Sequence, residues 1–223
     1  MNTTAIIVAA GAGRRLGAGL PKAFVRLCGR PMVLCSLSAF QRHPGVGEIV
    51  LVVPPGYVDR LEAWRRRYPK LSRIIAGGRE RTDSVRAGLG ALSPECRTVL
   101  VHDAARPLVS PGDISAVIAA TARHGAAILA APVADTVKLA RGRKILKTVD
   151  RTGLWKAQTP QGFRRRLIEQ AYARRGRATD DSLLLERAGV TVRLVPAKGE
   201  NIKVTTTTDL EIATCLLLKK RRG

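Results

Sequence analysis

A glycine-rich segment with two nearby cations has the composition of a phosphate-binding loop. Residues 9–16 read AAGAGRRL, and Lys22 follows shortly after. Glycine has no side chain, so backbone N–H groups at Gly11 and Gly13 can approach an anion closely. Arg15 and Lys22 add two positive charges to the same loop. A plain glycine turn would explain the two glycines, but the added cations favour a site for a triphosphate.

Two common phosphate-binding motifs do not match this loop. A dinucleotide fingerprint needs a third glycine where Leu16 stands. It also needs an acidic residue after the second strand, where Pro54 and Pro55 stand instead. A Walker loop ends in Gly-Lys followed by Ser or Thr, and the segment lacks that ending. The loop therefore indicates phosphate binding of a different type.

The charge of the chain indicates anionic partners. The 223 residues carry 39 Lys and Arg against 17 Asp and Glu, a formal net charge of +22. Nucleotides, phosphorylated metabolites and nucleic acids all fit this charge. Aromatic residues, on which single-stranded bases stack, make up only 4% of the chain, and the basic residues are spread along it. A nucleic-acid-binding protein is therefore the weaker alternative.

Neither a membrane segment nor an export signal is expected. The longest apolar stretches, such as 126–133, are far shorter than the roughly 20 residues that a membrane span needs. The first four residues carry no basic group, so they do not resemble a signal peptide. The cysteines form no C-x-x-C pair, so no zinc site is expected, and free thiols predict a cytoplasmic location. They are Cys28, Cys35, Cys96 and Cys215.

Strand-length apolar runs alternate with helix-length segments, and these elements must position the loop. We expect strands over 5–9, 49–53, 72–75, 99–101, 127–130 and 190–195. We expect helices over 31–42, 58–68, 80–92, 163–173, 180–188 and 206–218. A further helix is expected to start at Ser110, which would act as its cap. Continuous apolar strands are buried on both faces, so the pattern predicts an α/β fold: a mostly parallel, Rossmann-like sheet with helices on both faces. The length suits a single domain over 1–223.

One segment breaks the alternation and predicts a projecting arm. Residues 135–148 alternate apolar and charged side chains around Arg141-Gly142-Arg143. That pattern is typical of a two-stranded hairpin with a glycine turn. We expect it to stand outside the main sheet, as an inserted arm at about 133–152.

Four further segments carry a resemblance to a known family. They read GGRERTDSV, VHDAARP, LWKAQTPQ and NIKVT, and they occupy residues 77–85, 101–107, 154–161 and 201–205. With the glycine loop, they resemble the nucleotidyltransferase superfamily that activates sugars and alditols. In this order they are similar to the 2-C-methyl-D-erythritol 4-phosphate cytidylyltransferase family of the non-mevalonate isoprenoid pathway. The resemblance runs from Ala5 to about Asp209.

This resemblance implies a reaction between CTP and methylerythritol phosphate. A phosphate oxygen of the second substrate attacks the α-phosphorus of CTP, and pyrophosphate leaves. The attacking oxygen is already anionic, so catalysis reduces to positioning two anions and neutralising charge. Lysine, arginine and Mg²⁺ or another divalent cation suit that task.

The resemblance also implies roles for particular residues. The catalytic cations would be Arg15, Lys22 and Lys203. Nucleotide binding would involve Ala9, Ala10, Gly11, Gly13, Gly78, Ser84 and Asp103. Gly78 and Ser84 would read the cytosine edge, and Asp103 would lie near the ribose and the metal. The second substrate would contact Arg106, Thr136, Arg151, Thr159, Thr179 and Thr205. In the family Thr136 and Arg151 come from the neighbouring subunit, so a homodimer through the arm is implied.

Several alternatives stay open at this stage. A cytidylyltransferase for ribitol or ribulose 5-phosphate shares the glycine loop and the late Asn-Ile-Lys, although Ala104-Ala105-Arg106 and residues 154–157 favour the isoprenoid family. Plain structural explanations also exist for individual residues. Asp103 would serve as a turn cap, and Ser84 would bond to its own helix backbone. Arg151 would be an ordinary surface arginine.

Overall fold

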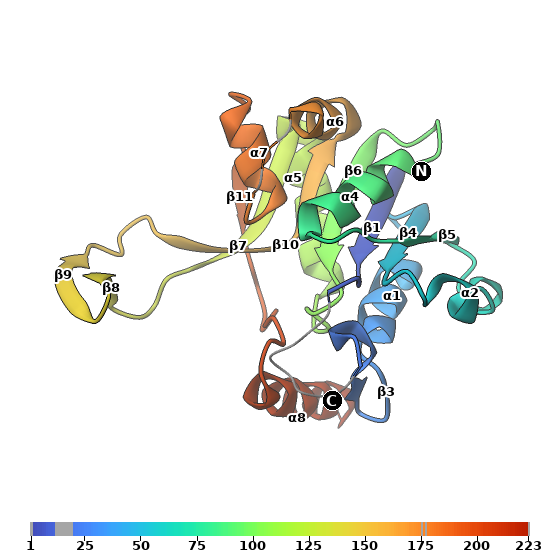
Figure 1. Ribbon diagram of the computed structural model, residues 1–223, viewed down its shortest axis with the longest axis horizontal. Coiled ribbons are helices and arrows are strands. Elements are labelled where there is room, and N and C mark those ends of the chain that lie inside the picture. Colours follow the sequence, from blue (N-terminus) through green and yellow to red (C-terminus); the bar gives the residue numbers. More distant parts are fainter. Residues whose placement is uncertain (1, 12–19, 175, 177, 223) are drawn as a thin grey trace.

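A seven-stranded sheet forms the centre of the molecule (Figure 1). The computed structural model describes residues 2–11, 20–174, 176 and 178–222. The strand order is β11-β7-β10-β6-β1-β4-β5. The strands span β1 (Thr3–Val8), β4 (Glu48–Val53), β5 (Leu71–Ala76), β6 (Thr98–Asp103), β7 (Ala126–Pro132), β10 (Trp155–Arg164) and β11 (Arg193–Pro196). Neighbouring strands are parallel except for β10, which is antiparallel to both β6 and β7.

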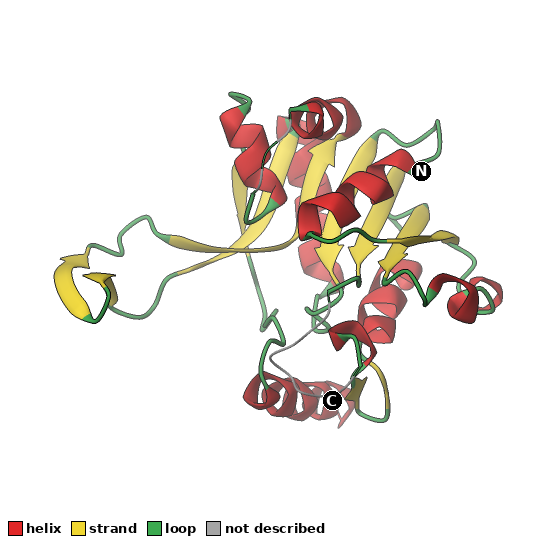
Figure 2. Ribbon diagram, in the orientation of Figure 1, coloured by secondary structure: helices red, strands yellow, loops and turns green. Residues whose placement is uncertain are grey.

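Successive residues of the central strands enter two different cores. Ile7 of β1 packs into one core and Ile6 into the other, because side chains alternate along a strand. Helices α1 (Val33–Arg42) and α5 (Pro111–His124) line the first core, and α4 (Arg81–Gly90), α6 (Arg165–Ala173) and α7 (Asp181–Arg187) line the second. Figure 2 shows these two helical layers on either side of the sheet. The mostly parallel α/β fold predicted from the continuous apolar runs is confirmed.

A smaller cluster lies beyond the carboxyl ends of the strands. The last helix, α8 (Thr207–Arg222), packs there against β2 (Arg26–Leu27), next to β3 (Arg30–Pro31) and the short 3₁₀ helix η2 (Lys22–Phe24). Thr206 caps α8, since its hydroxyl accepts from the Asp209 N–H at 3.2 Å. The Ser110 cap of α5 is present as well, with Ser110 Oγ accepting from the Asp113 N–H at 3.0 Å. Within the described part of the chain, no helix is long and apolar enough to cross a membrane.

One strand was not predicted, and the bounds of several predicted elements differ. Residues 155–164 form β10, and the helix expected from Phe163 begins at Arg165 as α6. The helix expected over 58–68 is divided into α2 (Val58–Leu61) and α3 (Trp64–Arg67). Tight i to i−3 backbone bonds occupy the junction, where the Glu62 N–H donates to the Asp59 carbonyl at 3.3 Å. The late strand lies at 193–196 rather than 190–195.

The hairpin predicted around Gly142 is present. Strands β8 (Val137–Arg141) and β9 (Lys144–Val149) pair antiparallel in a sheet of their own, and Gly142 adopts a φ of 59° in the turn. The hairpin projects away from the main sheet (Figure 1). It is joined to the sheet through β7 and β10.

Candidate active site

Two cavities of similar size meet at the carboxyl end of β6. One has a volume of about 530 Å³ and the other of about 520 Å³. Three charged residues line both cavities: Arg81, Asp103 and Lys203. Ligands of open α/β sheets bind at the carboxyl ends of the strands, so this position suits a site for two substrates.

The first cavity gathers most of the residues expected to bind a nucleotide. Val8 at the end of β1 lines it together with the start of the glycine loop. The expected residues that it brings together are Ala9, Ala10, Gly11, Lys22, Gly78, Ser84, Asp103 and Lys203. Thr205, expected to contact the second substrate, lines this first cavity instead. Gly13 and Arg15 lie outside the described residues.

The loop expected to read the base is closely packed. The Gly78 N–H donates to Ser84 Oγ at 3.2 Å, and the Ser84 hydroxyl donates to the Glu80 carbonyl one helical turn back at 3.2 Å. Ser84 therefore bonds to its own helix backbone, as the structural alternative predicted, and it also lines the cavity. A Cβ at Gly78 would lie 2.3 Å from the Cβ of Asp83. Glycine is therefore required at this position for the loop to pack against α4.

The second cavity holds three of the residues expected to bind the second substrate: Arg106, Thr159 and Thr179. The Arg106 guanidinium donates to the Asn201 carbonyl at 2.7 Å and to the Ala157 carbonyl at 3.3 Å. Those bonds fix its head at the cavity wall. Thr159 Oγ1 accepts from the Asp103 N–H at 3.1 Å, which ties β10 to the end of β6.

Two expected residues do not reach either cavity of their own chain. Thr136 and Arg151 are exposed and belong to the arm. The Arg151 guanidinium donates to the Ala134 carbonyl across the base of the hairpin. Their expected contact with a substrate therefore requires a second copy of the chain.

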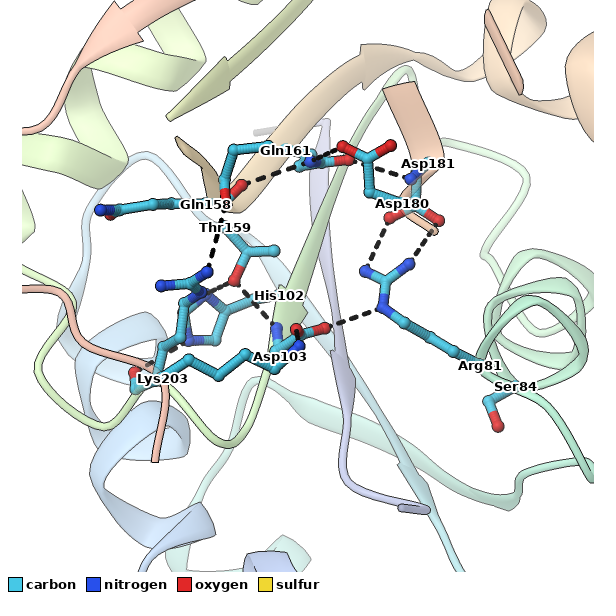
Figure 3. A network of polar contacts seen from close by, with 12 residues as sticks. Arg81, Ser84, His102, Asp103, Gln158, Thr159, Gln161, Asp180, Asp181 and Lys203 are labelled. Atoms are coloured by element: carbon cyan, nitrogen blue, oxygen red, sulfur yellow. Dashed lines mark hydrogen bonds and ion pairs between the residues drawn. The ribbon is translucent and has the colours of Figure 1, made fainter. Parts of the chain in front are cut away.

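Asp103 is the charged centre between the cavities. Its Oδ1 accepts from Arg81 Nε at 2.9 Å, and its Oδ2 accepts from Lys203 Nζ at 2.5 Å (Figure 3). Burial on its own would raise the pKa of this carboxyl, but the charges of Arg81 and Lys203 outweigh burial and hold the pKa well below its ordinary value. Asp103 is therefore an anion at any physiological pH.

Sequence reasoning assigned no role to Arg81, Asp181 or Tyr172. Arg81 donates to both oxygens of Asp181, at 3.0 Å and 2.8 Å, and the Tyr172 hydroxyl donates to Asp181 Oδ1 at 2.5 Å. Arg81 stands inside the segment 77–85, so that motif contained the signal. Nothing around Asp181 or Tyr172 in the sequence points to their pairing.

His102 precedes Asp103 but is not suited to proton transfer. Its side chain is fully buried, packs against the Phe40 ring at 4.9 Å between centroids, and contacts Thr159 Oγ1 at 3.1 Å. Burial lowers the pKa of His102 to about 3, so the ring stays neutral. His102 therefore has a structural role, packing at the end of β6.

Comparisons with known proteins agree on one family. The model of the family "2-C-methyl-D-erythritol 4-phosphate cytidylyltransferase" matches residues 3–219. A protein of that name from Pelotomaculum thermopropionicum is 44% identical, over 98% of this chain and 95% of that protein. Another from Geobacillus kaustophilus is 41% identical, over 99% of both chains. The chain also matches a bifunctional enzyme IspD/IspF from Rhodospirillum rubrum at 47% identity, where it spans 55% of that protein.

Solved structures give the same result for the fold. The 4-diphosphocytidyl-2C-methyl-D-erythritol synthase of Anaerococcus prevotii superposes with a TM-score of 0.84 at 31% identity, over 97% of this chain and 98% of that one. The 2-C-methyl-D-erythritol 4-phosphate cytidylyltransferase of Thermus thermophilus gives a TM-score of 0.80 at 33% identity, over 96% and 98% of the two chains.

Proposed function

Because the chain belongs to the 2-C-methyl-D-erythritol 4-phosphate cytidylyltransferase family, we propose that it transfers a cytidylyl group from CTP to 2-C-methyl-D-erythritol 4-phosphate. The products are 4-diphosphocytidyl-2-C-methyl-D-erythritol and pyrophosphate, as in non-mevalonate isoprenoid biosynthesis. One observation carries this proposal beyond the family match. Two cavities, each large enough for a small molecule, share a wall made of two cations and a carboxylate.

The two cavities suit a direct displacement between two bound anions. A phosphate oxygen of methylerythritol phosphate forms a bond to the α-phosphorus of CTP. The bond from that phosphorus to the bridging oxygen of pyrophosphate breaks, and pyrophosphate carries the electron pair away. The attacking oxygen is already deprotonated, so no general base is required. The neighbouring His102 is neutral and buried away from both cavities, which agrees with a mechanism that moves no proton.

The cations of the site have separate tasks in this proposal. Lys22, which lines the first cavity as Gly11 does, would hold the triphosphate together with the backbone of the loop. Lys203 lines both cavities, so it would neutralise charge at the α-phosphate, where the two substrates meet. Arg106 in the second cavity would hold the incoming phosphate.

The residues present fit a divalent cation supplied with the nucleotide. Asp103 is ionised and lines both cavities, and the described residues contain no group of three acidic, histidine or cysteine side chains that would form a complete metal cage. Mg²⁺ is commonly held by one or two carboxylates together with substrate phosphates and water. Asp103 would therefore hold Mg²⁺ or another divalent cation, and the bound ion would neutralise phosphate charge.

The arm supports a homodimer with shared sites. An isolated two-stranded hairpin is only marginally stable in water. Its large apolar side chains Leu139, Ile145 and Leu146 are 46%, 60% and 56% exposed in the single chain. A second copy of the arm would cover them, and Thr136 and Arg151 would then reach the partner's second cavity. We place this dimer in the cytoplasm, where the free thiols of the four cysteines are stable.

A side-by-side assay tests the proposed substrate. Pyrophosphate release from CTP is measured with methylerythritol phosphate, ribitol 5-phosphate and ribulose 5-phosphate at equal concentrations. We expect the highest kcat/KM with methylerythritol phosphate. A higher kcat/KM with either pentose-derived phosphate would assign the chain to the other cytidylyltransferase activity.

A further inference from the structure

Arg81 lines both cavities, but the guanidinium donates its hydrogen bonds to carboxylates of the protein. Its Nε–H donates to Asp103 Oδ1 at 2.9 Å, and its two Nη groups donate to Asp181 at 3.0 Å and 2.8 Å. Figure 3 shows the guanidinium lying between these two carboxylates. All three guanidinium nitrogens therefore donate to carboxylates, and one of these carboxylates, on Asp181, is fully buried. The contacts of Arg81 thus link two parts of the protein.

The far end of this link is firmly held. Asp181 is fully buried at the start of α7. Its Oδ1 accepts from the Tyr172 hydroxyl at 2.5 Å, and its own N–H donates to Gln161 Oε1 at 3.1 Å. Burial and the Asp181 charge raise the pKa of Tyr172, so its hydroxyl remains a donor. Asp181 therefore offers Arg81 a fixed anchor joined to α6, α7 and β10.

The near end of the link is the pair expected to handle phosphate chemistry. Asp103 Oδ2 accepts from Lys203 Nζ at 2.5 Å, so the carboxylate and the ammonium stand together between the cavities. Two cations and two carboxylates make up the set, and their formal charges cancel. A guanidinium is planar and rigid and carries N–H donors on several sides, so Arg81 can bond to both carboxylates at once. A lysine ammonium is a single point charge and cannot span them in this way.

We propose that Arg81 is a positioning residue: it ties Asp103 to the buried Asp181–Tyr172 pair and thereby sets the position of Lys203 between the two cavities. The inference rests on the proposed function for its kinetic consequences, but the position of Lys203 is measurable without turnover. The alternative is that Arg81 is itself a ligand of the triphosphate.

Two variants test the link at different strengths. Arg81→Lys keeps the positive charge but loses the planar set of N–H donors that bonds to both carboxylates. Tyr172→Phe removes only the hydroxyl that donates to Asp181. We expect kcat to fall at least about tenfold in Arg81→Lys and about threefold in Tyr172→Phe, with the KM for CTP within about twofold of wild type. Arg65→Lys is the matched control, because Arg65 pairs with Glu62 on the surface of α3. It should leave both constants unchanged. Thermal unfolding checks that each variant is folded.

A double-mutant cycle and a spectroscopic signal separate positioning from phosphate binding. If Arg81 acts through Asp103, adding Arg81→Lys to Asp103→Asn should change kcat little further. In protein with ¹³C-methylated lysines, the Lys203 resonance, assigned with Lys203→Arg, should shift toward those of exposed lysines in Arg81→Lys but not in Arg65→Lys.

Three results would overturn the proposal: a raised KM for CTP at unchanged kcat, multiplying losses in the double variant, or an unmoved Lys203 resonance. If wild type released no pyrophosphate while the resonance moved as expected, the proposed function would fail and the positioning role would stand.

Discussion

Lys203 and Asp103 stand 100 residues apart in the chain, and their ion pair, 2.5 Å from Nζ to Oδ2, occupies the boundary between the two cavities. An ammonium in this position faces both substrates of the proposed reaction. To reach a bound triphosphate it has to exchange a carboxylate partner for a phosphate. Arg81 retains Asp103 during that exchange, because its Nε bond uses the other carboxylate oxygen.

The two lysines of the first cavity should be necessary for turnover. We expect Lys22→Ala and Lys203→Ala each to lower kcat at least ~10²-fold, the scale of losing one preorganised charge contact. Neither side chain belongs to an apolar core, so circular dichroism and thermal unfolding should report an intact fold. Lys219→Ala, an exposed lysine of α8, is the control. Near-normal turnover of either cavity variant would remove that lysine from the mechanism.

Selection of the base should depend on Ser84. Its hydroxyl oxygen accepts from the Gly78 N–H in the first cavity, where the cytosine edge is expected. A pocket built from such groups leaves them unpaired when a wrong base enters. We expect wild type to prefer CTP over UTP and ATP, and Ser84→Ala to reduce that preference at least about tenfold in kcat/KM. Equal use of all nucleotides by wild type would place the base pocket elsewhere.

The parts of the fold that depend on local sequence were predictable, and the parts that depend on distant partners were not. The strand at 49–53 is a continuous apolar run, and the Ser110 cap needs only the neighbouring Asp113. Strand β10 has no comparable pattern. Gln161 is buried there because its Oε1 accepts from the N–H groups of Asp181 and Ser182. Gly162 fits because a Cβ would lie 2.2 Å from Thr121 Oγ1.

The candidate site divides in the same way. Motif positions predicted Lys22, Gly78 and Asp103, which meet around one cavity. The bond between Arg81 and Asp181 joins residues 100 positions apart, and no spacing in the sequence signals such a contact. Arg81 was visible in its motif, but its role depends on that distant partner.

A mixing experiment should reveal whether the arms cross between subunits. Arg151 lies in the exposed arm, and Lys22 lies in the first cavity. We expect Arg151→Ala and Lys22→Ala each to lose most activity alone. In a heterodimer with crossed arms, one site carries both defects and the other carries neither, so activity should return on mixing and subunit exchange.

The control for this experiment is each variant incubated with more of itself, which should recover nothing. Heterodimers are verified by differently tagged chains and their oligomeric state by sedimentation. Verified heterodimers without activity, or a chain that stays monomeric at working concentrations, would rule out the shared site.

Acid should weaken folding partly through His43. This ring is buried, its Nδ1 accepts from the Gly45 N–H at 3.0 Å, and its Nε2 bonds to Ser115 Oγ at 2.9 Å. Burial, with a smaller effect of the Lys70 charge, lowers the pKa of His43 below its ordinary value near 6.5. As the pH falls below 6.5, the unfolded chain takes up a proton that the folded protein does not, so the free energy of unfolding decreases.

Urea unfolding at pH 7.5, 6.5 and 5.5 measures this effect. The free energy of unfolding of His43→Gln should decrease less on acidification than that of wild type. The same substitution at the exposed His124 is the matched control. A His43→Gln profile parallel to wild type would contradict a neutral, buried His43.

The arm begins and ends at neighbouring points of one ladder. Pro132 of β7 is paired with Trp155 of β10, and the Val133 N–H donates to the Leu154 carbonyl at 3.0 Å. The arm is therefore a long insertion in the connection between β7 and β10, which otherwise form a simple antiparallel hairpin. We expect that a two-residue turn can replace it without breaking the seven-stranded sheet. We therefore expect the body and the arm to be separable: the body carries both cavities, and the arm serves the proposed assembly.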